Sequence, residues 1–579
     1  MAGSDPEDTY DVVVIGSGAG GMAAAVTAAA RGLTAVVVEK QPVFGGTTAF
    51  SGGYLWVPGH PKDGKPADPA EIEAARTYMR HEAGNAYDAG RVDAFLANGR
   101  RMVEFFEERT EVKFLDAPAF SDYHPEAPGG RPGGRSILTA PLEGRALGDD
   151  IGRLRPPLST ITFVGMMFNS SQEVNHFFNV TRSPASAWHV AKRLVAHARD
   201  LALHRRGMRL TSGNALAARL ALSARRYGVP ILTGSPARAL VRDAGRVVGV
   251  EIDTPFGRRA IRARHAVVLA AGGFPQDPAR RKELFPHAPT GSEHVSPAPD
   301  GNTGDGLRLG EGAGGVVSAD LANAAAWIPV SRVPTKGGGH AVFPHLIDRY
   351  KPGVIAVAPD GRRFVNEANS YHDFGQAMIA ATAGRECRAW LVCDHRALRK
   401  YGLGFVKPFP LPIGHHIRSG YLVRGGTPRE LAERAGFDPV GFEAEIRAFN
   451  TAARDGADPQ FGKGTTAYNR FLGDANHQPN PCVAPLEHGP YYAIRLALGD
   501  LGTFAGLRTD AETRVLDVAG EPVPGLHAVG NDAASVMGGA YPGGGITLGP
   551  ALTFGFIAGN TIADAAAPAL EPSVEGRGA

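Results

Sequence analysis

The chain has 579 residues, which is enough for several domain-sized units. Hydrophobic residues make up 43% of it and charged residues 21%, close to the averages of globular proteins, which argues against disorder, coiled coil and fibre. The 61 basic and 58 acidic residues leave a formal charge of +3, which argues against nucleic acid as a partner.

The three cysteines, Cys387, Cys393 and Cys482, are odd in number and lack histidines at zinc-binding spacing. We expect them to be reduced packing residues, and we expect no metal. The first eleven residues are polar and acidic, without the regions of a signal peptide, and no apolar run reaches about 18 residues. A cytoplasmic enzyme is therefore expected.

The N-terminal segment is typical of one βαβ unit. Residues 10–15, YDVVVI, are apolar and β-branched, as a buried parallel strand requires. A helix of small residues then runs to Gly32, and a second strand follows at 34–40. Between the first strand and the helix lies GSGAGG at 16–21, and Glu39 lies 18 residues after the last glycine. In this context the pattern is the dinucleotide-binding fingerprint.

Each position of the fingerprint has a geometric role. Gly16 permits a tight turn, Gly18 lets the backbone approach a pyrophosphate, and Gly21 allows close packing of the helix on the strand. The pyrophosphate would lie at the helix N-terminus, where free N–H groups and the helix dipole favour an anion. Glu39 would accept hydrogen bonds from the adenosine ribose, and its charge disfavours the 2′-phosphate of NADP.

Three further segments favour FAD over NAD: FGGTTAFSGG at 44–53, AVVLAAGGF at 266–274 and GLHAVGND at 525–532. Their order resembles the glutathione-reductase-type FAD domain and, more narrowly, the flavoprotein subunit of the succinate dehydrogenase and fumarate reductase superfamily. The resemblance implies an α/β fold in which an α+β substrate-capping domain is inserted into a Rossmann-like FAD domain. No histidine occurs in 44–53, where members with covalent flavin carry theirs, so FAD is expected to be non-covalent.

The same resemblance places the FAD domain in two parts, 1–328 and 502–579, on either side of a substrate domain at 329–501. An apolar insertion is expected near 150–210. It includes residues 157–180, which are apolar and aromatic but too short and broken to span a bilayer. This segment is either a buried part of the substrate domain or a patch that touches a membrane surface or a hydrophobic substrate entrance.

Under this resemblance Asp532 would lie near the ribityl chain of FAD, and the C-terminal helix would point at the isoalloxazine. The residues expected to contact FAD lie in the glycine-rich loops, at the ends of the strands that precede them, and at the start of the C-terminal helix. They are Gly16, Gly18, Ala19, Gly20, Gly21, Glu39, Lys40, Gly46, Thr47, Thr48, Ser51, Gly52, Gly53, Ala271, Gly272, Gly530, Asn531, Asp532, Gly545, Ile546 and Leu548.

The segment GRRFVNE at 361–367 is a hallmark of the superfamily's substrate-capping domain. In the soluble fumarate reductases an arginine proton donor follows this Glu by four positions, whereas this chain has Tyr371. A tyrosine lacks the permanent cation that clamps a dicarboxylate, but it can exchange a proton with a carbon acid. Its ordinary pKa is about 10, so a tyrosine base needs its anion stabilised.

Four motifs occur in order along the chain. They are SDYHPEAPGG at 121–130, RFVNE followed by Tyr371, GPYYAIRLALGDLGT at 489–503 and AYPGGGITLGPALTFGF at 540–556. Taken together they resemble the 3-ketosteroid Δ1-dehydrogenase family. The chain departs from that family at the carbonyl-binding turn, where YPGGG replaces the common YPGPG.

The resemblance implies a role for each of four residues. Tyr371 would be the base, and Tyr123 would donate a hydrogen bond that favours its anion. Tyr541 and the Gly545 amide would bind the substrate ketone as an oxyanion site. Tyr371 would take the C2 proton of a 3-ketosteroid while the C1 hydride leaves to flavin N5, and a quinone-type acceptor would reoxidise FAD.

Three alternatives stay open. Desaturation of a smaller ring, such as a cyclohexanone or an oxocyclohexane carboxylate, could use the same tyrosines. A fumarate-reductase-like enoate reductase is the second, and the absence of arginine at position 371 counts against it. A catalytically silent flavin-binding protein is the third. Of the nearby side chains, Tyr468 and Tyr492 are expected in the core, and His124 and His372 at the surface.

Overall fold

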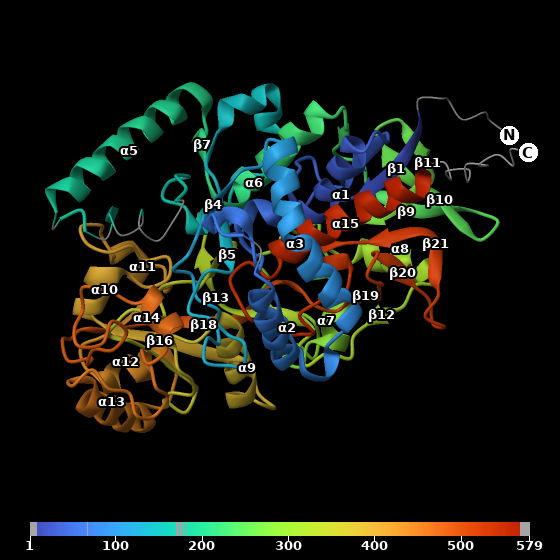
Figure 1. The fold of residues 1–579 in the computed structure, drawn as a ribbon. Helices are drawn as coiled ribbons and strands as arrows, with labels where there is room; N and C mark the ends of the chain where they lie inside the picture. The colour runs from blue at the N-terminus through green and yellow to red at the C-terminus, as the bar shows by residue number, and fades with distance from the viewer. Residues whose placement is uncertain are drawn as a thin grey trace, which may run out of the picture.

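The computed structural model describes residues 8–66, 68–168, 173, 176–177, 179–181 and 183–567. The described chain folds around two principal β-sheets with helices outside them. In Figure 1 the larger sheet lies towards the upper right and the smaller one towards the lower left.

The predicted βαβ unit is present as β1 (Thr9–Ile15), α1 (Ala19–Ala30) and β2 (Ala35–Val38). Most of β1 and all of β2 are buried, because helices cover both faces of the sheet to which they belong. The glycine fingerprint spans the turn between β1 and α1 and the first residues of α1, so the sequence pattern and the local structure agree at this point.

The larger sheet is built around β1 and β2. Its strand order is β20-β21-β11-β1-β2-β8, with β10 and β9 continuing from β11. β21, β11, β1, β2 and β8 are parallel, so the loops that follow their carboxyl ends meet at one edge of the sheet. The added strands are β8 (Ile231–Leu232), β9 (Ala237–Asp243), β10 (Arg246–Thr254), β11 (Gly257–Leu269), β20 (Arg514–Leu516) and β21 (Pro522–Ala528).

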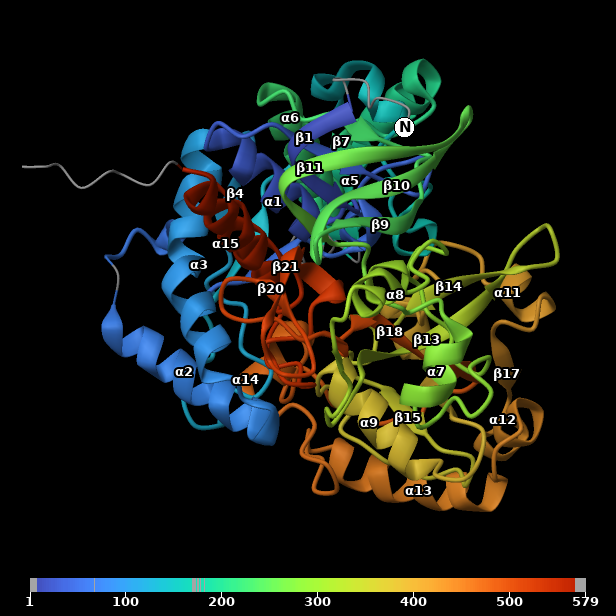
Figure 2. The same cartoon turned by 90° about the vertical axis from the view of Figure 1, so that its right-hand side faces the viewer.

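The C-terminal helix α15 (Leu548–Ala566) packs along α1, and small residues let the two helices approach closely. A Cβ added at Gly555 would lie 2.5 Å from the carbonyl oxygen of Gly20. The long helix α3 (Ala89–Arg109) covers α15 from outside, and Figure 2 shows these helices together at one side of the larger sheet. The first and last parts of the chain therefore form one unit.

The smaller sheet is antiparallel and has the order β14-β13-β18-β16-β15, with β17 beside β18. Helices cover it, so this part of the chain is α+β and the predicted fold class is confirmed. The predicted domain limits at 328 and 501 stay a prediction. The elements are β13 (Ala325–Pro334), β14 (His340–Pro344), β15 (Val354–Val357), β16 (Arg388–Asp394), β17 (Val423–Gly425), β18 (Tyr491–Thr503), α9 (Tyr371–Ala381), α10 (His395–Tyr401), α12 (Pro428–Ala435), α13 (Pro439–Ala453) and α14 (Ala467–Leu472).

The predicted apolar insertion lies at the periphery, where helix α5 (Pro184–His204) forms one edge of the molecule in Figure 1. Trp188 and Val195 on this helix are 66% and 71% exposed. Within 157–180, residues 169–172, 174–175 and 178 lie outside the described residues. Among the described helices, none combines the length and the apolar character that a bilayer crossing requires.

Candidate active site

The first cavity lies at the carboxyl edge of the larger sheet and has a volume of about 1040 Å³. The loops after β1, β2 and β11 and the turn after β21 meet there, as the parallel topology requires. Most of the residues predicted to contact FAD line this cavity. They are Gly16, Gly18, Ala19, Gly20, Glu39, Lys40, Gly46, Thr47, Thr48, Ser51, Ala271, Gly272, Gly530, Asn531 and Leu548.

The fingerprint turn is shaped for a diphosphate. Gly16 has a φ of +109°, and a Cβ there would lie 2.1 Å from the carbonyl oxygen of Ala270. A Cβ at Gly18 would have no such backbone clash, since its nearest neighbour is Thr48 Oγ1 at 3.7 Å, so glycine here keeps space at the cavity wall. The first turn of α1 carries no acidic side chain. Its N-terminus therefore fits an anionic group, as FAD requires.

Two charged residues at the end of β2 are held by their surroundings. Glu39 Oε2 accepts hydrogen bonds from Ser17 Oγ at 2.5 Å and Ser17 N at 3.2 Å, and Oε1 accepts one from Gln41 N at 2.8 Å. Lys40 Nζ lies 2.7 Å from Asp305 Oδ2. The carboxylate of Glu39 is thus fixed in the cavity wall, where an acceptor for ribose hydroxyls was predicted.

Six predicted FAD contacts lie elsewhere. Gly21 packs against the fingerprint turn and β1, since a Cβ there would lie 2.2 Å from Gly16 O and 3.1 Å from Val14 Cγ1. Buried Ile546 lines a different, smaller cavity. Asp532 is the clearest difference. It does not line the first cavity, and its carboxylate accepts hydrogen bonds from Ala271 N at 2.5 Å and Gly273 N at 2.9 Å. Asp532 thus holds the turn after β11 on the side away from the cavity, and burial raises the pKa of its carboxyl to about 6. The other three, Gly52, Gly53 and Gly545, line the second cavity.

The sequence analysis missed several residues of the first cavity. Arg155 brings a guanidinium into it, and burial lowers the pKa of that group. Asn302 donates from Nδ2 to Thr47 Oγ1 at 2.9 Å and to Gly272 O at 3.1 Å. Both residues stand alone in irregular segments, so no motif marks them. Among the described lining residues of both cavities there is no histidine or cysteine.

The second cavity has a volume of about 1730 Å³ and adjoins the first. Its walls are largely apolar and aromatic, and they include the described parts of the apolar insertion at Leu158, Ile161 and Phe168. A substrate in the second cavity would therefore lie next to a cofactor in the first. The residues that line both are Thr47, Ser51, Leu501, Thr547 and Leu548.

The three predicted tyrosines meet in this second cavity. Tyr123 OH donates a hydrogen bond to Tyr371 OH at 3.0 Å. The Tyr541 ring is stacked on Tyr123 with centroids 5.6 Å apart and lies edge-on to Tyr371 with centroids 4.9 Å apart. All three side chains are buried, at 4 to 7% exposed, and Gly545 lines the same cavity. The structure thus brings together the four residues that the family resemblance selected.

One of the three tyrosines begins a helix, and the other two lie in loops. Tyr371 is the first residue of α9, whose N-cap Ser370 accepts a hydrogen bond from Asp373 N. Tyr123 lies in an irregular loop that is tied to the Tyr541 turn, because Tyr123 N donates to Pro542 O at 2.9 Å. A second bond to the same carbonyl comes from Tyr78 OH at 2.7 Å. The two loops therefore hold one another in place.

The loop with Tyr123 rests on a buried ion pair. Asp122 Oδ2 lies 2.7 Å from Arg135 Nη1, and its Oδ1 accepts a hydrogen bond from Trp56 Nε1 at 2.8 Å. Gly545 has a φ of +99°, and a Cβ there would lie 2.5 Å from the backbone of Tyr54. Only glycine fits this close approach, which fixes where the Gly545 amide lies.

Burial raises the pKa of Tyr371 well above its ordinary value, and the neighbouring Tyr123 and Tyr541 raise it further.

A second group of tyrosines lies behind Tyr123. The Tyr468 ring lies 4.5 Å from the Tyr123 ring, Tyr468 OH lies 2.6 Å from Tyr350 OH, and Arg349 donates to Tyr350 OH at 3.2 Å. Burial raises the pKa of Tyr468, and the charge of Arg349 opposes that rise. Tyr468 is buried in the core, as predicted, and it also lines the second cavity, which was not predicted.

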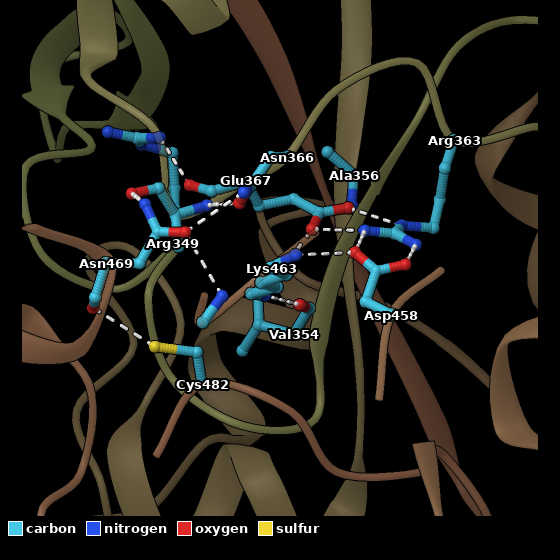
Figure 3. A network of polar contacts seen from close by, with 12 residues as sticks. Arg349, Val354, Ala356, Arg363, Asn366, Glu367, Asp458, Lys463, Asn469 and Cys482 are labelled. Atoms are coloured by element: carbon cyan, nitrogen blue, oxygen red, sulfur yellow. Dashed lines mark hydrogen bonds and ion pairs between the residues drawn. The ribbon is translucent and has the colours of Figure 1, made fainter. Parts of the chain in front are cut away.

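A buried ion network supports the segment that leads into α9 (Figure 3). Arg363 binds Glu367 and Asp458 with distances of 2.8 Å to each, and Lys463 Nζ lies 3.5 Å from Glu367. Two positive and two negative charges therefore balance away from water. Arg349 links this network to the tyrosines, because its Nη1 donates to the backbone oxygen of Glu367 at 2.6 Å. This is the structural role of the RFVNE segment.

Of the two histidines beside the tyrosines, His372 contradicts the expected surface placement and His124 does not. His372 is buried, its Nδ1 accepts a hydrogen bond from Trp327 N, and burial lowers its pKa to about 4. His124 is partly exposed and bridges Glu82 at 2.8 Å and Asp373 at 2.9 Å. Burial lowers its pKa, but these two hydrogen-bonded carboxylates outweigh burial and raise it to about 10.

Comparison with known proteins agrees with this geometry. The chain matches the FAD binding domain family over residues 11–548. It is 42% identical over 555 residues to 4-oxocyclohex-2-ene-1-carboxylate 5-dehydrogenase of Sinomonas cyclohexanicum, covering 96% of this chain and 93% of that protein. It is 38% identical over 573 residues to 3-oxosteroid 1-dehydrogenase of Mycolicibacterium smegmatis, covering 96% and 98%.

A solved structure is similar over the same length. The crystal structure of 3-ketosteroid delta1-dehydrogenase from Sterolibacterium denitrificans, in complex with 1,4-androstadiene-3,17-dione, has a TM-score of 0.89 at 35% identity and is matched over 96% of this chain and 100% of that one. The family match, the relatives and the cavity at the fingerprint turn all point to the same cofactor, FAD. The chain therefore belongs to the 3-oxosteroid 1-dehydrogenase family, within the FAD-binding flavoproteins of the succinate dehydrogenase and fumarate reductase type, and it is an FAD-dependent oxidoreductase.

Proposed function

We propose that this enzyme desaturates a ring ketone between its α and β carbons, in the first place a 3-ketosteroid between C1 and C2. The observation that carries the proposal is the hydrogen bond from Tyr123 to Tyr371 at 3.0 Å in a cavity that adjoins the FAD site. FAD, when bound, supplies the acceptor for the hydride that leaves C1.

The protein's part is to make an α-proton removable. Tyr541 OH and the Gly545 amide hold the ketone oxygen and stabilise the negative charge that gathers there. Tyr371 takes the proton from C2, and Tyr123 donates a hydrogen bond to the resulting phenolate oxygen. Because burial works against this anion, the proposal requires that Tyr123 and the phenols behind it stabilise it.

The size and the apolar walls of the second cavity suit a steroid skeleton. The relatives named 3-oxosteroid 1-dehydrogenase support this substrate class. The relative named 4-oxocyclohex-2-ene-1-carboxylate 5-dehydrogenase is 42% identical, and it favours a second candidate, a cyclohexanone with a ring carboxylate. Enoate reduction of the fumarate reductase kind has less support, since Tyr371 stands where that chemistry uses an arginine.

Anaerobic mixing with single ketones tests the proposal. Androst-4-ene-3,17-dione should bleach the flavin absorbance and yield the 1,4-diene. Bleaching by 4-oxocyclohexanecarboxylate, with no response to the steroid, would select the second candidate. If no cyclic ketone bleaches the flavin while fumarate reoxidises the reduced enzyme, the reaction runs in the reductive direction and the proposal fails.

Three finer points belong to the same proposal. FAD is held non-covalently, so acid precipitation should release all of it into the supernatant. The electron acceptor is a quinone, as the family resemblance implies, and the sequence carries no second glycine fingerprint for a nicotinamide. The membrane contact predicted for 157–180 extends to helix α5, on which Trp188 and Val195 are exposed. Co-sedimentation with phospholipid vesicles, which Trp188→Ser should weaken, tests this contact.

A further inference from the structure

Arg91 is a buried cation that the proposed chemistry does not use. It lies in the first turn of α3 and is 6% exposed. Its Nη2 donates a hydrogen bond to the backbone oxygen of Ala534 at 2.6 Å, and its guanidinium lies 5.3 Å from the centroid of the Phe554 ring. Its Nε–H has no acceptor among the described residues. The group is charged, because arginine is not deprotonated in proteins.

This charge has no countercharge from the chain. The side-chain contacts of Arg91 are with neutral groups, and in the described part of the chain no carboxylate forms an ion pair with it. Burial lowers the pKa of Arg91, and Asp88 and Asp510 only partly oppose this effect. Asp88 accepts a hydrogen bond from the backbone N of Arg91, and Asp510 pairs with Arg514. Since an unpaired buried cation is costly, we look for an anion from outside the chain.

Arg91 lies beside the cofactor site. It lines a cavity of about 470 Å³, here called the Arg91 cavity, which adjoins the first cavity. The residues that line both are Gly530, Asn531, Thr547 and Ala551. Thr547 also lines the second cavity, so all three cavities meet at the residue before α15. Figure 2 shows α3, which carries Arg91, beside α15.

The meeting point at Thr547 indicates which part of FAD faces Arg91. The diphosphate fits the N-terminus of α1, whereas the reactive ring has to reach the second cavity, where the ketone is proposed to lie. A hydride brings two electrons and one hydrogen to the neutral oxidised ring, which then carries one negative charge. In apolar surroundings a nearby cation stabilises this anion and has little effect on the neutral oxidised ring.

We propose that Arg91 is the countercharge of the reduced flavin and thereby raises the reduction potential of FAD. In the reaction the ketone loses the C1 hydride to the ring and the C2 proton to Tyr371. Reoxidation passes two electrons and the added hydrogen to the quinone, which takes one further proton from solvent and becomes a hydroquinone, and the ring is neutral again. Arg91 does not line the second cavity, so it is a positioning residue of charge and not a substrate contact.

This inference rests on the proposed function only in placing the ketone in the second cavity, and it holds for any ketone of that class. Arg91→Gln removes the charge and keeps an N–H donor for the Ala534 carbonyl. The affinity for reduced FAD should fall at least about tenfold relative to that for oxidised FAD, which equals a midpoint potential lower by about 30 mV for a two-electron couple. Affinity for oxidised FAD should stay nearly unchanged.

The potential is measured without a ketone, by slow reduction with xanthine and xanthine oxidase beside a reference dye. Fluorescence titration of the apoprotein measures affinity for oxidised FAD. Arg91→Lys keeps the charge and should keep most of the potential. Arg219→Gln is the matched control, because Arg219 donates to the backbone oxygens of Ala140, Glu111 and Pro141 and lines none of the three cavities. Its potential should equal that of the unmodified enzyme.

Arg91→Met gives a second comparison if the glutamine variant does not fold, since apolar replacements of buried ions are often neutral or stabilising. An unchanged potential in both variants would overturn the inference. An equal loss of affinity for oxidised and reduced FAD would assign Arg91 to the diphosphate, and an equal fall of the potential in Arg91→Lys and Arg91→Gln would assign the effect to shape. If neither the glutamine nor the methionine variant folds, Arg91 serves the fold alone.

Failure of the proposed function is distinguishable from failure of this inference. An enzyme that desaturates no ring ketone would leave the flavin unbleached in the anaerobic assay. The midpoint potential would still differ between the unmodified enzyme and Arg91→Gln, because its measurement requires bound FAD and no substrate.

Discussion

Tyr123 and Tyr371 are 248 positions apart in the chain, yet their hydroxyl oxygens lie 3.0 Å apart with Tyr123 as the donor. The pair lies in the wall of a cavity that shares Thr47 and Leu548 with the FAD cavity. A hydrogen bond donated to a phenolate oxygen stabilises the anion, so the direction of this bond suits Tyr371 as a base that must lose its own proton first.

Removal of the Tyr371 hydroxyl should stop the reaction without loss of FAD or substrate binding. Tyr371→Phe is expected to lower kcat by about 10²- to 10⁴-fold, the usual contribution of a general base, while FAD and the ketone still bind. Single-turnover flavin bleaching measures the rate, and the flavin spectrum measures retention. Tyr421→Phe is the control, since Tyr421 OH lies 2.8 Å from Ser331 Oγ and outside the cavity. A Tyr371→Phe variant with ordinary activity would exclude this residue from the mechanism.

Tyr541 should affect both binding and rate. Tyr541→Phe removes one of two proposed donors to the ketone oxygen, so we expect a weaker complex with the product dienone and a kcat lower by about 10²- to 10³-fold. Titration of the oxidised flavin spectrum with the product gives the affinity, and stopped-flow bleaching gives the rate. A variant that loses rate with no change in affinity would assign Tyr541 to the transition state alone. An unchanged rate would place the ketone elsewhere.

The two glycines of the fingerprint should respond differently to alanine. Gly16→Ala places a methyl group 2.1 Å from a carbonyl oxygen at a φ of +109°, so the protein should fold poorly or not at all. Gly18→Ala meets Thr48 Oγ1 at 3.7 Å and should fold normally. Its methyl group enters the cavity, so FAD affinity should fall at least about tenfold. A tenfold loss corresponds to about 1.4 kcal/mol of binding free energy. Fluorescence titration of the apoprotein with FAD, beside a melting curve of each variant, separates the two effects.

The raised pKa of His124 should make the stability of the folded protein depend on pH. Its pKa is raised from 6.5 to about 10 by Asp373 and Glu82, which outweigh burial. The folded state therefore binds this proton more tightly than the unfolded state. The stabilisation is complete below about pH 6.5 and is lost as the pH rises through about 10. The melting temperature should fall over that interval more in the unmodified protein than in His124→Asn. If the melting temperatures of the two proteins fall equally with pH over this range, the raised pKa of His124 is contradicted.

The local parts of the fold were predictable because their causes are local. Apolar β-branched strands, small residues in the helix and a glycine turn in fixed order define β1, α1 and β2 within 30 residues. The smaller sheet was not predicted strand by strand, because its pairs such as β13 with β18 join segments more than 150 positions apart. Long-range pairing leaves little trace in a single sequence.

The site was predictable to the extent that motifs marked it. Tyr123, Tyr371 and Tyr541 were found through a family resemblance and not through any pattern in their own neighbourhoods. Tyr468 was correctly expected in the core, but its place in the cavity wall was not predicted, since an aromatic residue in a short helix carries no mark of the cavity it faces. Arg155 was missed because it stands alone in an irregular segment that no motif marks. Asp532 was assigned to the cofactor from the family resemblance. Its carboxylate accepts hydrogen bonds from the backbone of Ala271 and Gly273, and its contact with the ribityl chain stays a prediction.

The FAD cavity takes its walls from both extremes of the chain: Gly18 near the beginning, and Leu548 and Ala551 near the end. Synthesis must therefore have passed α15 before both walls of the nucleotide site are present. A chain truncated before α15 lacks one wall of the binding site, so it would bind no FAD and would lack the yellow colour of the flavin. Binding of FAD would therefore report that synthesis has passed α15.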